Sequence, residues 1–259
     1  MGHRRLGELP KTRNWLKVVA LLKRTDDPGK IADETSRAAQ RGLELAKSNV
    51  GVAQTIYTLI KVVWAARSDD FKGDLAKIGV SLSKDASLMD VVGSVDEAID
   101  KKLRNFGHRS DLAEMARLSA VDALTDMCRS ETGSLFGISL QNTQATLKKY
   151  ATPDRFAVVG QNFFGKFAYR FLDYHLSREL QNHIGPGKQF ADIKGCERFK
   201  EALALHCNQT ARIVKEFAGC WPSATQFHEG ITIENVRTKF VPVAFKKIQE
   251  ELQRRVANE

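Results

Sequence analysis

The chain has 259 residues, of which 42% are apolar and 27% charged, a composition that excludes a disordered protein and suffices for one large domain or two small ones. Its formal net charge is +9. Basic residues are in excess in residues 1–24, with seven Lys or Arg against one Glu, and again in the C-terminal half, whereas residues 85–131 carry ten acidic residues against six basic ones. This distribution favours nucleic acid or an acidic protein as partner, and a solvated basic surface is the simpler alternative.

The cysteine pattern and the hydropathy narrow the class of protein further. The four cysteines are far apart and form no C-x-x-C pair, so neither a zinc ribbon nor a disulfide scaffold is expected. The N-terminus lacks the features of a signal peptide, and the most apolar stretch, 50–66, is interrupted by Lys61 and is shorter than the ~20 residues of a membrane span. We therefore expect a cytoplasmic protein with no membrane crossing, no metal and no cofactor.

Apolar residues recur with helical periodicity between the few Pro and Gly breakers. The sequence therefore predicts an all-α protein, a multi-helix bundle of about ten helices. The predicted helices are 11–24, 28–48, 50–67, 69–80, 87–105, 109–129, 140–150, 153–184, 195–219 and 234–256. Pro242 lies inside the last of these and is expected to kink or shorten it.

A loop of small residues, 130–137, separates the acidic half from the basic half. Two packed helical subdomains, 1–130 and 138–259, fit this division. One large bundle-like domain fits equally well, because neither half carries a linker of flexible composition.

The first predicted helix, 11–24, is basic and amphipathic, with Trp15, Val18 and Leu22 on one face. Such a helix binds a nucleic-acid backbone, a membrane surface or an acidic partner, unless it is an ordinary edge helix with a solvated charged face. The last helix carries a similar basic rim. The candidate nucleic-acid or partner contacts are Arg4, Arg5, Lys11, Arg13, Lys17, Lys246, Lys247, Arg254 and Arg255.

The long helix 153–184 changes character along its length. Phe163, Phe167 and Phe171 follow the three- and four-residue spacing of a face buried in the core. His175, Glu179, and His183 then recur every four residues beside Arg178 and Asn182, before Gly185-Pro186-Gly187 ends the helix. This polar cluster has the residue types of a metal site or of acid–base chemistry, and a solvated helix terminus is the alternative.

Two Arg–His pairs share one spacing, Arg170-x4-His175 and Arg178-x4-His183. This spacing resembles the R-x4–6-H signature of HEPN-fold ribonucleases, which are all-helical, usually dimeric and frequent in bacterial conflict systems. The resemblance implies metal-independent cleavage of RNA, with Arg170, His175, Arg178 and His183 as candidate catalytic residues, and it implies a homo-oligomer.

A second resemblance rests on short motifs in the C-terminal half: Ser177-Arg178-Glu179-Leu180, Asn182-His183, Gly185-Pro186-Gly187, Phe217-Ala218-Gly219-Cys220-Trp221 and Gly230-Ile231-Thr232. This pattern is similar to uncharacterised helical accessory proteins of bacterial anti-phage systems, including the helical subunit of the Qat system. The sequence contains no phosphate loop, dinucleotide fingerprint, nucleophile elbow or H-E-x-x-H motif.

The leading hypothesis is therefore a non-catalytic structural or adaptor subunit of a bacterial defence complex. Its expected partner is a protein subunit, an ATPase or a nuclease. The alternatives are a HEPN-like ribonuclease and a nucleic-acid-binding protein.

Overall fold

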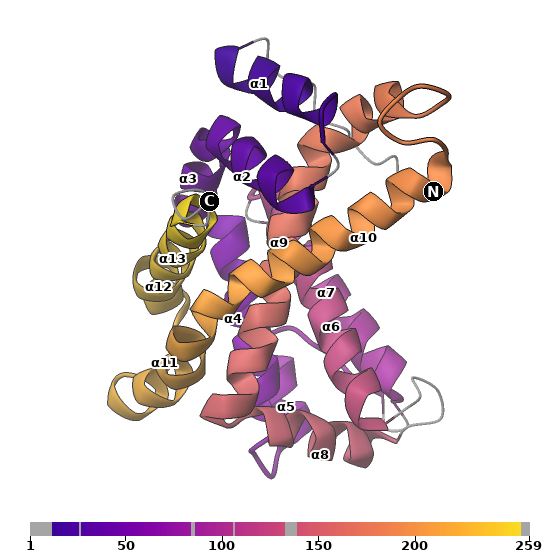
Figure 1. The fold of residues 1–259 in the computed structure, drawn as a ribbon. Helices are drawn as coiled ribbons and strands as arrows, with labels where there is room; N and C mark the ends of the chain where they lie inside the picture. The colour runs from indigo at the N-terminus through magenta and orange to yellow at the C-terminus, as the bar shows by residue number, and fades with distance from the viewer. Residues whose placement is uncertain (1–11, 26, 84–85, 106, 133–138, 255–259) are drawn as a thin grey trace.

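The computed structural model describes residues 12–25, 27–83, 86–105, 107–132 and 139–254. Apart from one isolated β-bridge between Ile184 and Phe190, regular structure in these residues is helical, so the all-α prediction is confirmed (Figure 1). The elements are α1 (Arg13–Leu22), α2 (Pro28–Ala38), α3 (Gln40–Ser48), α4 (Val50–Ala65), α5 (Phe71–Lys77), α6 (Leu88–Asn105), α7 (Asp111–Thr132), α8 (Leu140–Tyr150), α9 (Pro153–Leu180), the 3₁₀ turn η1 (Gln181–His183), α10 (Ile193–Thr210), the 3₁₀ turn η2 (Ala211–Val214), α11 (Lys215–His228), α12 (Ile233–Asn235), the π-helical turn η3 (Val236–Phe240) and α13 (Val241–Arg254).

Local sequence signals account for several helix starts. The Asp27 side chain accepts hydrogen bonds from the amides of Gly29 and Lys30, and Pro28 occupies the first position of α2. Asn49 caps α4 and Asp192 caps α10 in the same way. These side chains satisfy backbone donors that the first turn of a helix leaves without an intrahelical partner.

The 28-residue helix α9 runs through the middle of the molecule and packs against α7, α10 and α11 (Figure 1). Phe163, Phe164, Phe167 and Phe171 are all buried, which confirms the prediction that this stripe belongs to the core. The rings of Phe164 and Phe167 also contact Phe245 of α13, with centroids 5.4 and 5.0 Å apart. Residues distant in the sequence therefore complete one aromatic core.

Two of the predicted helices are broken where tertiary contacts override local preference. The segment predicted as 28–48 divides at Ala39 into α2 and α3. This bend brings Gly42 against Phe171 so closely that a Cβ at Gly42 would lie 2.9 Å from the Phe171 ring. The segment predicted as 195–219 ends at Thr210, and a 3₁₀ turn with Ala211 and Val214 buried redirects the chain into α11.

Pro242 disturbs the last helix, as predicted. Because proline has no N–H to donate and its ring crowds the preceding turn, a regular α-helix cannot continue through this position unchanged. The structure accommodates it with the π-helical turn η3 immediately before α13, in which the amide of Val241 donates to the carbonyl of Val236. Such a turn inserts one extra residue and shifts the register of the helix that follows.

The predicted boundary between subdomains falls at residues 133–138, which lie outside the described part. The two halves contact each other extensively: α9 packs on α7, and α13 packs on α3 (Figure 1). The buried apolar side chains of both halves belong to one cluster. Whether 1–130 and 138–259 are separate subdomains stays a prediction.

Candidate functional site

The first candidate pair, Arg170 and His175, points in two directions. Five residues correspond to about 140° around a helix, so the two side chains leave α9 on different sides. The Arg170 guanidinium donates to Asp122 of α7 at 2.7 Å. His175 instead lies among aromatic rings. The structure therefore does not bring this pair together.

His175 is enclosed by Trp15 of α1 and by Phe171 and Tyr174 of its own helix, with ring centroids 4.9, 5.3 and 5.1 Å away. Burial lowers the pKa of the imidazole from 6.5 to about 4, because the charged form loses its hydration. His175 is thus neutral at physiological pH, and its ring fixes α1 on α9.

The second pair, Arg178 and His183, lies at the end of the same helix. His183 is buried, and its Nε2 is 3.0 Å from the Glu179 carboxylate, whose other oxygen accepts a hydrogen bond from Asn182 at 3.2 Å. The α-helix ends at Leu180, so His183 lies in the 3₁₀ turn η1. Arg178 is exposed.

This arrangement confirms part of the predicted polar face. Glu179 and His183 do meet, whereas His175 is turned toward Trp15 and away from them. The Gly185-Pro186-Gly187 stop follows, with Gly185 and Gly187 at φ of 131° and 72°. Across the residues that the structure describes, no three His, Cys, Asp or Glu side chains are grouped so that they could hold a metal ion.

A buried polar cluster between α9 and α10 was not predicted. The Ser177 hydroxyl donates to the carboxylate of Asp173, which is only 1% exposed. The Lys200 ammonium lies 3.4 Å from both the Asp173 carboxylate and the Ser177 hydroxyl. A serine beside a lysine is an arrangement that nucleophilic enzymes use, but here the carboxylate holds the ammonium as an ion pair. The cluster therefore joins two helices.

One feature of the sequence points to this cluster. Asp173 and Ser177 are four residues apart, which places them on one side of α9 among apolar positions. Nothing in the sequence identifies Lys200, which lies on a different helix, as the partner. The thiol of Cys196 is nearby, and burial raises its pKa.

The described residues also contain a cleft of about 360 Å³ between the start of α2 and the side of α10 that faces it. Its wall includes the buried side chain of Asp33 and the ring of His206. The exposed side chain of Leu205 also lines it. None of the predicted catalytic residues lines this cleft. The candidate catalytic residues and the cleft therefore do not coincide.

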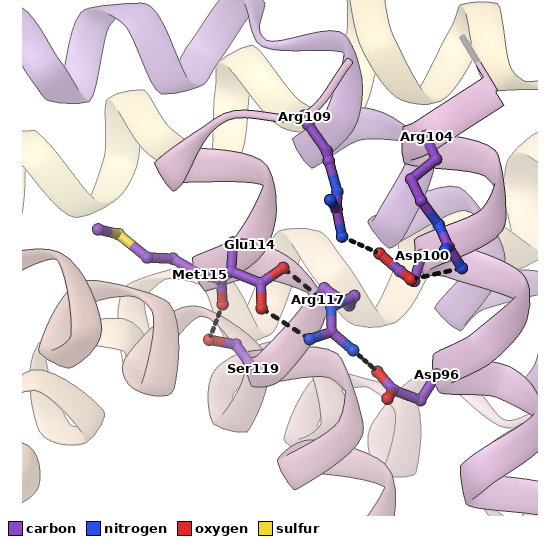
Figure 2. Close-up of polar contacts among 8 residues, drawn as sticks. All are labelled: Asp96, Asp100, Arg104, Arg109, Glu114, Met115, Arg117 and Ser119. Atoms are coloured by element: carbon purple, nitrogen blue, oxygen red, sulfur yellow. Dashed lines mark hydrogen bonds and ion pairs between the residues drawn. The ribbon is translucent and has the colours of Figure 1, made fainter. Parts of the chain in front are cut away.

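A network of ion pairs links α6 to α7 (Figure 2). The Arg117 guanidinium forms two hydrogen bonds with Glu114 and a third with Asp96. Asp100 pairs with Arg104 at 2.8 Å and with Arg109 at 3.0 Å. Three cations of this acidic half, Arg104, Arg109 and Arg117, are thus engaged by carboxylates of the chain itself.

The predicted basic contacts differ in their surroundings. Arg13 and Lys17 are exposed on α1, whereas Lys246 lies 3.8 Å from Glu250 on α13 and Lys247 is half-buried. The remaining candidates, or their side chains, lie outside the described part of the chain: Arg4, Arg5, Lys11, Arg254 and Arg255.

All four cysteines are free thiols, and three of them are buried. None of the helices in the described ranges is both long and apolar enough to cross a membrane. The sequence matches no family model, no curated protein and no solved structure.

Proposed function

We propose that this chain is a non-catalytic helical subunit that binds a partner protein in a bacterial defence complex. The observation that carries the proposal is that three of the four candidate catalytic side chains serve structural contacts. Arg170 pairs with Asp122, His175 packs on Trp15, and buried His183 contacts Glu179. A ribonuclease site would need these side chains to converge on one phosphodiester.

The periphery of the molecule supports a binding role. Among the described residues, five large apolar side chains on four helices are more than half exposed: Leu16, Leu45, Ile193, Leu205 and Phe227, the last at 85%. Apolar side chains held in solvent by a rigid helix contribute binding energy when a partner covers them. The proposed partner is an ATPase or nuclease subunit, as the resemblance to anti-phage accessory proteins implies.

Co-purification tests the proposal. The affinity-tagged chain is co-expressed with the products of its neighbouring genes, and the complex is examined by size-exclusion chromatography with light scattering. We expect a stoichiometric complex with one neighbour, and loss of defence when the gene is deleted. If the neighbours do not bind and deletion leaves their function intact, the adaptor role is wrong.

The ribonuclease alternative requires a separate measurement. Purified chain is incubated with a labelled RNA in the presence of EDTA, alongside Arg178→Ala and His183→Ala. We expect no cleavage by the parent chain. Cleavage that either substitution abolished would replace the binding proposal with an enzymatic one.

A further inference from the structure

Helix α1 lies across one end of the molecule, with its inner side on the bundle and its outer side away from it (Figure 1). The inner side consists of Trp15, Val18 and Leu22, which are all buried. It packs on α2, and Trp15 reaches His175 of α9. The apolar face of α1 that the sequence predicted is therefore buried inside the protein and is not available to a partner.

The outer side has its own pattern. At about 100° per residue, Leu16 and Ala20 are roughly 40° apart and form a short apolar strip. Both are exposed, Leu16 to 62%. Lys23, the C-cap residue in helical conformation, flanks the strip on one side, and Arg13 and Lys17 flank it on the other; a fourth cation, Arg24, directly follows the cap.

These four cations are all exposed and, within the described part of the chain, have no ion-pair partner. Three cations on or beside α6 and α7, by contrast, pair with carboxylates of the chain: Arg104, Arg109 and Arg117. The outer side of α1 is thus an apolar strip bordered on both sides by exposed cations that form no ion pair with the described residues.

We propose that the outer face of α1 is the docking seam for an acidic amphipathic helix of a partner protein. An apolar seam flanked by charges is the pattern by which two helices pair, because the seam side chains interdigitate while flanking charges select the partner. The cations on both borders specify carboxylates opposite them. This inference rests on the proposed function and names the partner's chemistry.

Two other anionic partners fit the surface less well. A membrane requires a broad apolar face to insert, and the apolar face of α1 is buried against α2 and α9. Nucleic-acid phosphates would complement the four cations but would leave Leu16 and Ala20 without apolar contacts. Nucleic acid is therefore an outcome that the experiment distinguishes.

The test uses the full chain and a fluorescein-labelled helical peptide of about three heptads, with Leu at the seam and Glu at the flanking positions. Binding is followed by fluorescence anisotropy. The variants are Leu16→Gln, which removes the apolar anchor, and the double substitution Arg13→Glu with Lys17→Glu. The matched control is Lys101→Glu with Arg129→Glu, which makes the same change in net charge at exposed positions of α6 and α7.

We expect the peptide to bind the parent chain, and each α1 variant to weaken binding by about tenfold, the effect of losing ~1.4 kcal/mol. The control should bind as the parent does. A peptide that does not bind, or α1 variants that bind as tightly as the parent, would overturn the seam. Binding of a single-stranded oligonucleotide that is weakened by the charge reversal and unchanged by Leu16→Gln would also overturn it, in favour of nucleic acid.

The same variants separate this inference from the proposed function. If the parent chain and both α1 variants co-purify equally with a neighbouring gene product, the seam is wrong and the subunit role stands. If the parent chain itself binds no neighbour, the subunit role fails whatever the peptide does.

Discussion

Replacing Lys200 with methionine should destabilise the protein far more than removing an ion pair usually does. The substitution keeps the aliphatic stem against α9 but removes the ammonium beside Asp173. The Asp173 carboxylate is 1% exposed, so water cannot take over the role of the ammonium. The carboxylate would then lose the ammonium beside it while it stays in the interior of the protein.

The magnitude follows from the burial of the two partners. Removing one partner of a fully buried ion pair costs about 3–5 kcal/mol, whereas exposed pairs contribute about 0.2–1 kcal/mol. Because the Lys200 side chain is 29% exposed, we expect Lys200→Met to cost about 2–3 kcal/mol in the free energy of unfolding. In a protein of this size that lowers Tm by about 5–10 °C.

Urea denaturation followed by circular dichroism measures the effect, and Lys166→Met is the matched control. Lys166 on α9 pairs with Asp126 at 2.7 Å, closer than the Lys200 pair, but the Asp126 side chain is 43% exposed. We expect the control to cost less than about 1 kcal/mol. Equal losses in the two variants would refute the reasoning from burial, as would a double substitution of Asp173→Asn and Lys200→Met that is less stable than Lys200→Met alone.

Two further predictions concern helix packing and pH. Gly219→Ala would place a Cβ 2.5 Å from the Pro153 carbonyl oxygen and should lower the free energy of unfolding by about 1–3 kcal/mol. At Gly93 an added Cβ meets nothing within 4 Å, so Gly93→Ala should raise the free energy of unfolding by about 0.5–1 kcal/mol. Thermal unfolding that ranks the two variants in the opposite order would contradict the packing of α9 on α11. Because burial lowers the pKa of His175 to about 4, the unfolded chain takes up a proton between about pH 6.5 and 4 that the native protein does not, so stability falls across this window. In urea titrations, the free energy of unfolding should fall less between pH 7 and pH 5 for His175→Phe than for the parent. An equal fall in the two proteins would argue against an imidazole that stays neutral in the folded protein.

Local patterns predicted those features of the fold that depend on neighbours in the sequence. The aromatic spacing of Phe163, Phe167 and Phe171 identified the core face of α9, and the predicted helix 140–150 matches α8. The effect of Pro242 followed from its missing N–H. Each of these depends on chemistry within a few turns of one helix.

The remaining features depend on contacts between distant residues. The break at Ala39 has no local signal, since alanine is a strong helix former, and it coincides with the packing of Gly42 on Phe171. His175 departs from the predicted polar face because Trp15 packs on it. The ion-pair partner of Asp173 lies on another helix, so the sequence around Asp173 does not identify it. A spacing of residues fixes a face of a helix, but the fold decides what that face meets.

The position of α13 has a consequence for biosynthesis. Because α13 packs on α3 and Phe245 contacts Phe164 and Phe167, the aromatic core stays uncovered until α13 has been translated. Contacts that span most of a chain slow folding, since a long loop must close before they stabilise anything. The nascent chain therefore exposes phenylalanines while it is still on the ribosome, and we expect it to engage chaperones that hold apolar segments until synthesis of α13 is finished.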